Sequence, residues 1–129
     1  MRRSDSGVDD LYAAWGEAFR RQDVDAIIEL MTPDYVLWVP GAAELDSEGL
    51  RPRLKAAFAV YEITSSFDCV ERLVAGDLTI DRGWDIQRLR PRLGGEEMIN
   101  RQRVMLVLRR CSDERWRFAR GISQAGPPA

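Results

Sequence analysis

Apolar residues recur at two different spacings along this 129-residue chain, and the spacing changes near residue 62. Before that point they recur every three or four residues, which is typical of amphipathic helices. After it they alternate with polar residues, which is typical of strands with one buried face. The sequence therefore predicts helices first and a sheet afterwards.

Three helices and one short strand are expected in the first half. The first helix has Ser6 as its N-cap and carries the apolar positions Val8, Leu11, Tyr12, Trp15, Ala18 and Phe19. The second helix starts at Asp23, and Pro33 is expected to end it. Residues 35–39 are expected to form a strand, and the third helix starts at Ser47 or Pro52.

Four long strands are expected in the second half, over residues 64–74, 78–89, 99–109 and 116–123. Short turns at 75–77, 94–95 and 111–114 join them, so neighbouring strands are antiparallel. Strands of this length twist and curl, and the N-terminal helices would fill the concave side. The sequence predicts an α+β fold, and its length fits one domain.

The composition fits a water-soluble globular protein, with 45% apolar and 31% charged residues and a formal net charge of −2. Arginines at 88, 90, 92, 101 and 103 gather near one hairpin, but the net charge argues against a nucleic-acid or membrane partner. We expect a cytoplasmic protein, because the sequence has no secretory leader and no bilayer-spanning apolar run. Cys69 and Cys111 are expected to be free thiols.

The sequence contains no histidine. This excludes Ser-His-Asp and Cys-His catalysis and every histidine-ligated metal site. An acid or base would have to be a carboxylate, a tyrosine, a thiol or Lys55. No metal and no cofactor are expected, since there is no P-loop, no Rossmann glycine pattern and no cysteine-ligand spacing.

Several short segments resemble the NTF2-like superfamily, and in particular its SnoaL-like domains. They are Tyr12-Ala13-Ala14-Trp15, residues 23–31, Pro33-Asp34-Tyr35, Pro40-Gly41, Ala75-Gly76-Asp77, residues 106–110 and residues 113–118. The resemblance covers residues 7–124 and leaves residues 1–6 and 125–129 as flexible tails. It implies a cone-shaped, cystatin-like fold with a pocket between the helices and the sheet. It also implies a homodimer formed through the outer face of the sheet.

The resemblance extends to ketosteroid isomerases and polyketide cyclases, whose catalytic positions can be compared with this chain. The isomerase tyrosines fall at Trp15 and Phe58, its base falls at Val39, and its acid falls near Val104 or Leu106. None of these side chains can abstract a proton or donate as a phenol does. The comparison argues against steroid isomerisation by the known mechanism and leaves the catalytic residue unknown.

Apolar and aromatic side chains are the first candidates for lining the pocket, although plain core packing is the alternative for each. They are Trp15, Phe19, Val39, Phe58, Trp84 and Trp116. Arg82, Arg88 and Arg120 lie in phase with apolar positions of predicted strands. A guanidinium among core positions needs a buried partner or a pocket to point into. Arg88 is expected to reach solvent, whereas for Arg82 and Arg120 a pocket position and a solvent position are both open.

Polar candidates are less distinctive. Gln102 and Asn100 share a face with apolar residues of one strand and are expected at the pocket mouth or in solvent. Asp68 and Asp85 are mid-strand and are expected to pair with Arg82 or Arg120. Glu44 and Asp46 lie in the loop after the Pro-Gly pair, and solvation is the simpler interpretation for both.

The leading hypothesis is a small-molecule-binding domain with a mostly apolar pocket. Arg82 or Arg120 would orient an anionic or carbonyl end of a hydrophobic ligand. An enzymatic version would be a cofactor-free isomerase, cyclase or dehydratase acting on a hydrophobic carbonyl compound, with Arg120, Gln102 and Tyr12 stabilising an enolate-like charge. The alternative is a non-catalytic dimeric interaction module.

Overall fold

Residues 3–126 are described by the computed structural model, with side chains from Gly7 onward. In this range the helices are α1 (Arg3–Arg20), α2 (Val24–Glu29) and α3 (Ser47–Val60). The strands are β1 (Met31–Trp38), β2 (Tyr61–Ala75), β3 (Leu78–Pro91), β4 (Met98–Arg110) and β5 (Trp116–Ala125). The order of elements is the expected one. Helix α1 begins before the expected cap Ser6, and the outermost residues of the expected tails, 1–2 and 127–129, lie outside the described range.

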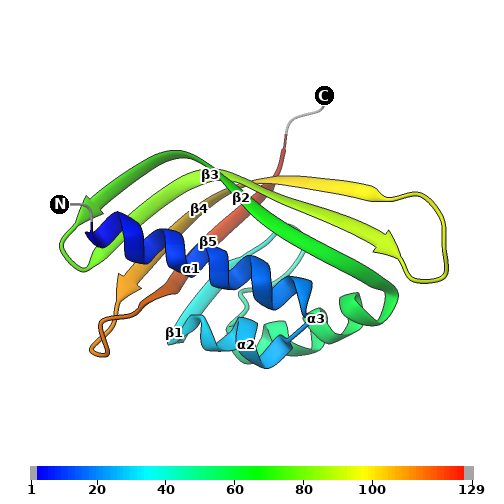
Figure 1. Ribbon diagram of the computed structural model, residues 1–129, viewed down its shortest axis with the longest axis horizontal. Coiled ribbons are helices and arrows are strands. Elements are labelled where there is room, and N and C mark those ends of the chain that lie inside the picture. Colours follow the sequence, from blue (N-terminus) through cyan, green and yellow to red (C-terminus); the bar gives the residue numbers. More distant parts are fainter. Residues whose placement is uncertain (1–2, 127–129) are drawn as a thin grey trace.

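The five strands form one curled sheet in the order β1-β5-β4-β3-β2. Strands β2 to β5 are antiparallel, and β1 pairs with β5 in parallel. All three helices lie on the concave side of the sheet, with α1 running across it (Figure 1). The expected α+β architecture, with a curled and mostly antiparallel sheet, is confirmed.

The junction between α2 and β1 differs from the expectation. Asp23 caps α2 as expected, because its Oδ1 accepts a hydrogen bond of 3.0 Å from the amide of Ala26. Pro33 does not end this helix, since α2 already stops at Glu29 and Pro33 lies within β1. The proline is tolerated because β1 is an edge strand whose register is irregular between Met31 and Val36.

Helix α3 begins at Ser47 rather than Pro52, because Asp46 caps it by accepting a 2.7 Å hydrogen bond from the amide of Gly49. The loop before this helix is tied to β1 by two backbone hydrogen bonds. Leu37 N donates to Leu45 O at 2.8 Å, and Leu45 N donates to Leu37 O at 3.0 Å. The loop of residues 38–44 is therefore closed at its base.

The bend in the sheet has a local cause. Strand β2 contains a bulge between Cys69 and Glu71, and Gly83 of β3 lies opposite it. A Cβ atom at Gly83 would lie 2.1 Å from the carbonyl oxygen of Asp68. Glycine at this position lets the two backbones approach closely where the sheet turns.

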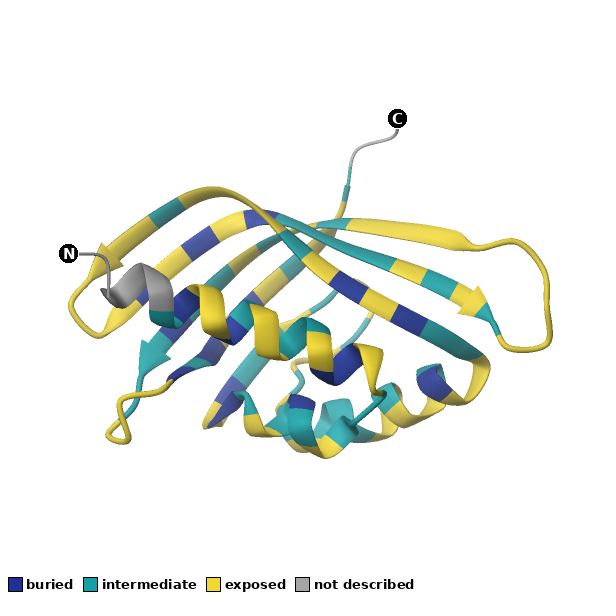
Figure 2. Cartoon of the chain, in the orientation of Figure 1, coloured by how far each residue is buried: buried dark blue, intermediate teal, exposed yellow. Residues whose placement is uncertain are grey.

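The core lies between the helices and the concave face of the sheet. Buried and exposed residues alternate along β2 and β3, as Figure 2 shows. The buried apolar residues include Val8, Leu11 and Phe19 from α1, Ile27 from α2, and Leu108 from β4. In the described part of the chain, no helix is long and apolar enough to cross a membrane.

Candidate functional site

A partly open cavity of about 210 Å³ lies between α1, α3, β1 and the concave face of the sheet. Its lining is mainly apolar and comes from every strand. The lining residues are Tyr12, Trp15, Phe19, Met31, Tyr35, Leu37, Val39, Leu50, Leu54, Ser65, Ser66, Phe67, Asp85, Gln87, Gln102, Val104, Leu106, Phe118 and Ser123. Asp85 is the only residue among them that carries a charge at neutral pH.

Aromatic rings form much of one wall, because three aromatic residues of α1 face the sheet. Tyr12 stacks on Phe67 of β2 with ring centroids 4.6 Å apart. Trp15 packs edge-on against Phe118 of β5 at 5.1 Å, and also against Phe19 at 5.0 Å. These contacts pack the rings against the sheet and against one another.

A short hydrogen-bond chain leads from α1 to the carboxyl group of Asp85 on β3. Trp15 Nε1 donates to Ser65 Oγ at 3.0 Å, and Ser65 Oγ donates to Asp85 Oδ1 at 3.3 Å. An indole N–H can only donate, so Ser65 accepts from it and directs its own single hydrogen toward Asp85. Among the described residues, Asp85 Oδ2 has no hydrogen-bond partner.

Burial raises the pKa of Asp85 from 3.8 to about 6, because an apolar surrounding disfavours its charged form. The hydrogen bond from Ser65 acts in the opposite direction and lowers it. Burial also raises the pKa of Tyr35, and the nearby charge of Asp85 raises it further. At neutral pH the cavity therefore contains one mostly ionised carboxylate beside a neutral phenol.

Three further polar side chains that belong to this lining are Gln87, Gln102 and Ser123. Gln102 of β4 pairs directly with Asp85 in the sheet register, and Gln87 follows two residues later on the same face of β3. Ser123 Oγ is buried and lacks a hydrogen-bond partner among the described residues. Buried polar groups normally have partners, so Ser123 is a free hydrogen-bonding group at the cavity wall.

Tyr12 has a structural role as well as a place in the lining. Its hydroxyl donates to Asp81 Oδ2 at 2.8 Å, and Arg72 forms two bonds of 2.8 and 2.9 Å to the same carboxylate. Asp81 of β3 is fully buried, and it forms an ion pair with Arg72 of β2. Because the Tyr12 hydroxyl is engaged here, it does not provide the free donor expected from the sequence.

Four of the eight residues proposed from the sequence for the pocket do line the cavity: Trp15, Phe19, Val39 and Gln102. Phe58 is buried behind the wall, packed against Phe19 with ring centroids 5.5 Å apart. Trp116, which the sequence also singled out, is buried in the core and is outside the lining.

Arg82 and Trp84 lie on the convex face of the sheet rather than in the cavity. The side chain of Arg82 is 51% exposed and pairs with Glu71 at 2.7 Å. Trp84 stacks under the guanidinium of Arg101, 4.6 Å from the ring centroid. They share their face of β3 with Ile80 and Ile86, and that face points away from the helices.

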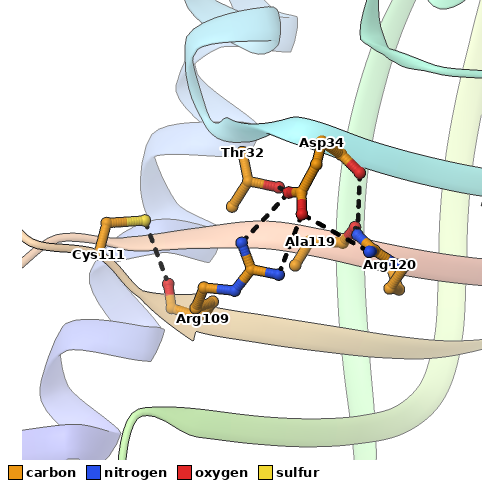
Figure 3. Close-up of polar contacts among 6 residues, drawn as sticks. All are labelled: Thr32, Asp34, Arg109, Cys111, Ala119 and Arg120. Carbon is orange, nitrogen blue, oxygen red and sulfur yellow. Dashed lines mark hydrogen bonds and ion pairs between the residues drawn. The ribbon is translucent and has the colours of Figure 1, made fainter.

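Arg120 also lies outside the cavity. Its Nη1 donates to the backbone oxygens of Asp34 and Ala119 at 2.9 and 2.7 Å, and its Nη2 lies 3.6 Å from Asp34 Oδ2 (Figure 3). Thr32 and Arg109 donate to the same carboxylate, and these hydrogen bonds lower the pKa of Asp34 to about 2. The arginine therefore belongs to a surface ion-pair group that ties β1 to β5.

The expected partners of the carboxylates are also different. Asp85 pairs with no arginine among the described residues, and Asp68 is exposed on the convex face. Glu44 accepts a hydrogen bond from Trp38, while Asp46 caps α3. Asn100 is exposed. Four of the lining residues were not singled out from the sequence: Tyr35, Ser65, Gln87 and Ser123. Three of them, Ser65, Gln87 and Ser123, alternate along their strands with other cavity-lining residues, and this alternation is the signal that could have found them.

The described residues contain no group of three or more potential metal ligands of the His, Cys, Asp or Glu type. Cys69 and Cys111 are free thiols. Among the residues that line the cavity, Asp85 is the one whose shifted pKa suits it to proton exchange near neutral pH.

This architecture, with a cavity between three helices and a curled sheet, defines an NTF2-like protein. The chain belongs to the SnoaL-like domain family, whose pattern matches residues 9–119. No curated protein matches the sequence at a significant level.

Solved structures agree with this fold at low sequence identity. A conserved protein from Planctomyces limnophilus is 21% identical, covering 98% of this chain and 100% of its own, with a TM-score of 0.88. A ketosteroid isomerase-like protein from Erwinia carotovora atroseptica is 20% identical over 95% of this chain and 96% of its own, with a TM-score of 0.75. An NTF2-like protein with a cystatin-like fold from Novosphingobium aromaticivorans is 17% identical over 97% and 83%, with a TM-score of 0.79. These similarities concern the fold.

Proposed function

We propose that this protein binds a small, mostly apolar molecule in the cavity, with the polar end of the ligand at Asp85. The observation that carries the proposal is a preformed hollow whose wall is apolar except for a few converging polar groups. Ligand sites of folded proteins have this composition. The family and the isomerase-like neighbour support ligand binding without defining the ligand.

The polar end of the ligand has a different partner from the one expected. An anionic or carbonyl end was expected to meet Arg82 or Arg120, but both are outside the lining. The cavity offers Asp85, Gln87, Gln102 and Ser123 instead. Asp85 would repel an anion, so the proposed ligand has a hydrogen-bond donor at this end.

A catalytic form of this function has one candidate group. A carboxylate whose pKa lies near 6 is a better proton acceptor than an ordinary aspartate, and it is still mostly ionised at neutral pH. Cofactor-free isomerisation, cyclisation or dehydration of a hydrophobic carbonyl compound would therefore depend on Asp85. The positions compared with the isomerase, Trp15, Val39 and Phe58, supply no acid or base.

Native mass spectrometry of freshly purified protein, followed by a matched pair of variants, tests the binding proposal. Val104→Phe fills the cavity from β4, whereas Met105→Phe adds the same ring to the exposed outer face of the same strand. We expect the added mass of one small molecule in the wild type and in Met105→Phe, and none in Val104→Phe. An equal bound mass in both variants would place the ligand elsewhere.

The expected homodimer and cytoplasmic location remain part of the proposal. The convex face carries exposed apolar residues, one from each of the five strands, in neighbouring register positions: Trp38, Leu73, Ile80, Met105 and Ile122. Exposed apolar patches of this kind are typical of protein interfaces. Light scattering would give twice the monomer mass for wild type and the monomer mass for Met105→Glu. A dimer without any ligand in the cavity would favour the alternative, a non-catalytic interaction module.

A further inference from the structure

The carboxylate of Asp85 has no counter-ion in the cavity. Neither arginine nor lysine occurs among the lining residues, and none donates to Asp85 in the described part of the chain. Asp81, which is fully buried, shows the contrast with the half-buried Asp85, because Arg72 binds Asp81 through two hydrogen bonds. A protein that pairs one buried aspartate and leaves the next unpaired keeps an uncompensated negative charge in its cavity.

The geometry leaves one carboxylate oxygen for a ligand. Ser65 occupies Oδ1, and Trp15 holds the Ser65 hydroxyl in the donating direction. Oδ2 has no partner among the described residues. An ionised carboxylate only accepts hydrogen bonds, so the group that fits here must be a donor.

The surrounding rings favour a positive donor over a neutral one. Tyr12, Trp15, Tyr35, Phe67 and Phe118 line the cavity, and aromatic faces attract cations. A neutral donor would satisfy the hydrogen bond but leave the charge of Asp85 uncompensated. A cationic donor makes the hydrogen bond and also compensates the charge of Asp85, whereas an anion does neither.

We propose that the ligand is a small amine, with a protonated primary or secondary amino group bound to Asp85 Oδ2 and a compact apolar body against the aromatic wall. This inference rests on the proposed function of the cavity. An apolar cavity of about 150 Å³ accommodates benzene, so about 210 Å³ fits one ring with a short side chain.

The amine must meet an ionised carboxylate, so its affinity depends on pH. The pKa of Asp85 is about 6, and the titratable groups that share the cavity with it are Tyr12 of α1 and Tyr35 of β1. Burial raises the pKa of both phenols, so they stay neutral. An alkylamine stays protonated well above pH 7. The affinity for an amine should therefore rise as pH rises through 6 and then level off.

Three probes of similar size test the charge preference by isothermal titration calorimetry. They are 2-phenylethylamine, 2-phenylethanol and phenylacetate, which are respectively cationic, neutral and anionic at pH 7.5. We expect the amine to bind at least tenfold more tightly than the alcohol, and the carboxylate most weakly. At pH 5 the affinity for the amine should fall about tenfold, while that for the alcohol stays within threefold.

Asp85→Asn removes the charge and keeps the shape, and Asp68→Asn is its control on the exposed face of the neighbouring strand. The tenfold preference for the amine should disappear in Asp85→Asn and persist in Asp68→Asn. The amine inference is overturned if the alcohol binds as tightly as the amine, or if Asp85→Asn retains the preference. If no probe binds to the wild type but all bind after cavity enlargement by Leu106→Ala, the inferred ligand size is wrong. If no probe binds to either protein, the proposed function itself fails.

Discussion

Replacing Asp85 with asparagine should stabilise this protein at neutral pH. The carboxyl group titrates near pH 3.8 in the unfolded chain and near 6 in the folded one. Its folded pKa is the higher one, so the folded state is favoured by protonation. The contribution of this carboxyl group to the stability of the fold is therefore fully present below pH 3.8 and is lost as pH rises through 6. Asparagine carries no charge and avoids this loss.

The magnitude follows from the two pKa values. The gap between 3.8 and about 6, at 1.36 kcal/mol for each pKa unit, corresponds to about 3 kcal/mol. Water entering the partly open cavity would solvate the carboxylate, so we expect Asp85→Asn to gain about 1–3 kcal/mol at pH 7.5. For a chain of this length each kcal/mol raises the melting temperature by roughly 3–5 °C.

Urea unfolding of wild type, Asp85→Asn and the exposed control Asp68→Asn at pH 7.5 and pH 3.5 measures this difference. We expect a gain for Asp85→Asn at pH 7.5 that vanishes at pH 3.5, with Asp68→Asn close to wild type at both. If Asp85→Asn lowered the free energy of unfolding at pH 7.5, or if its effect were equal at both pH values, the carboxylate would not be an uncompensated buried charge.

Three other substitutions examine the surroundings of the cavity. Ser65→Ala should raise the pKa of Asp85 above 6, because the hydroxyl hydrogen bond lowers it, and carbon-13 NMR of the carboxyl group would show this. Arg72→Leu should cost about 3 kcal/mol in the free energy of unfolding, because it leaves the fully buried Asp81 without its cation. Gly83→Ala should cost at least about 2 kcal/mol, because the new Cβ would overlap the backbone across the bulge.

Two of these substitutions, Ser65→Ala and Arg72→Leu, have an internal comparison. Ser66→Ala, next to Ser65, should leave the titration of Asp85 unchanged, because no hydrogen bond joins them. Arg82→Leu removes an exposed ion pair and should change stability by less than about 1 kcal/mol. An Arg72→Leu effect as small as that of Arg82→Leu would show that the buried pair contributes little.

The sequence predicted the order of the elements and the curled sheet, because helical and strand periodicities separate cleanly along the chain. Turn residues such as Gly76 and Gly94 also marked the strand ends, and both adopt positive φ. The junction at Pro33 was predicted wrongly, since a proline that would break a helix can also lie in an edge strand. Local sequence does not distinguish these two roles.

The candidate site was predicted only in part, for a reason that is visible in β3. The alternation of residues along β3 places Arg82 and Trp84 on one face of the strand and Asp85 and Gln87 on the other. It does not show which of the two faces is turned toward the helices. The apolar residues beside Trp84 suggested the wrong face. Register resolves the question, because Asp85 pairs with Gln102, which lines the cavity on the concave side. Register is a long-range property that one strand does not encode.

The two hydrogen bonds between Leu37 and Leu45 should influence how fast the proposed ligand enters and leaves the cavity. They close the loop that connects one cavity wall, at Val39, with another, at Leu50. A segment held by so few bonds opens at a much lower free energy than the sheet does. The residence time of a bound molecule is therefore expected to follow the opening of this loop, while its affinity follows the contacts with the aromatic wall behind it.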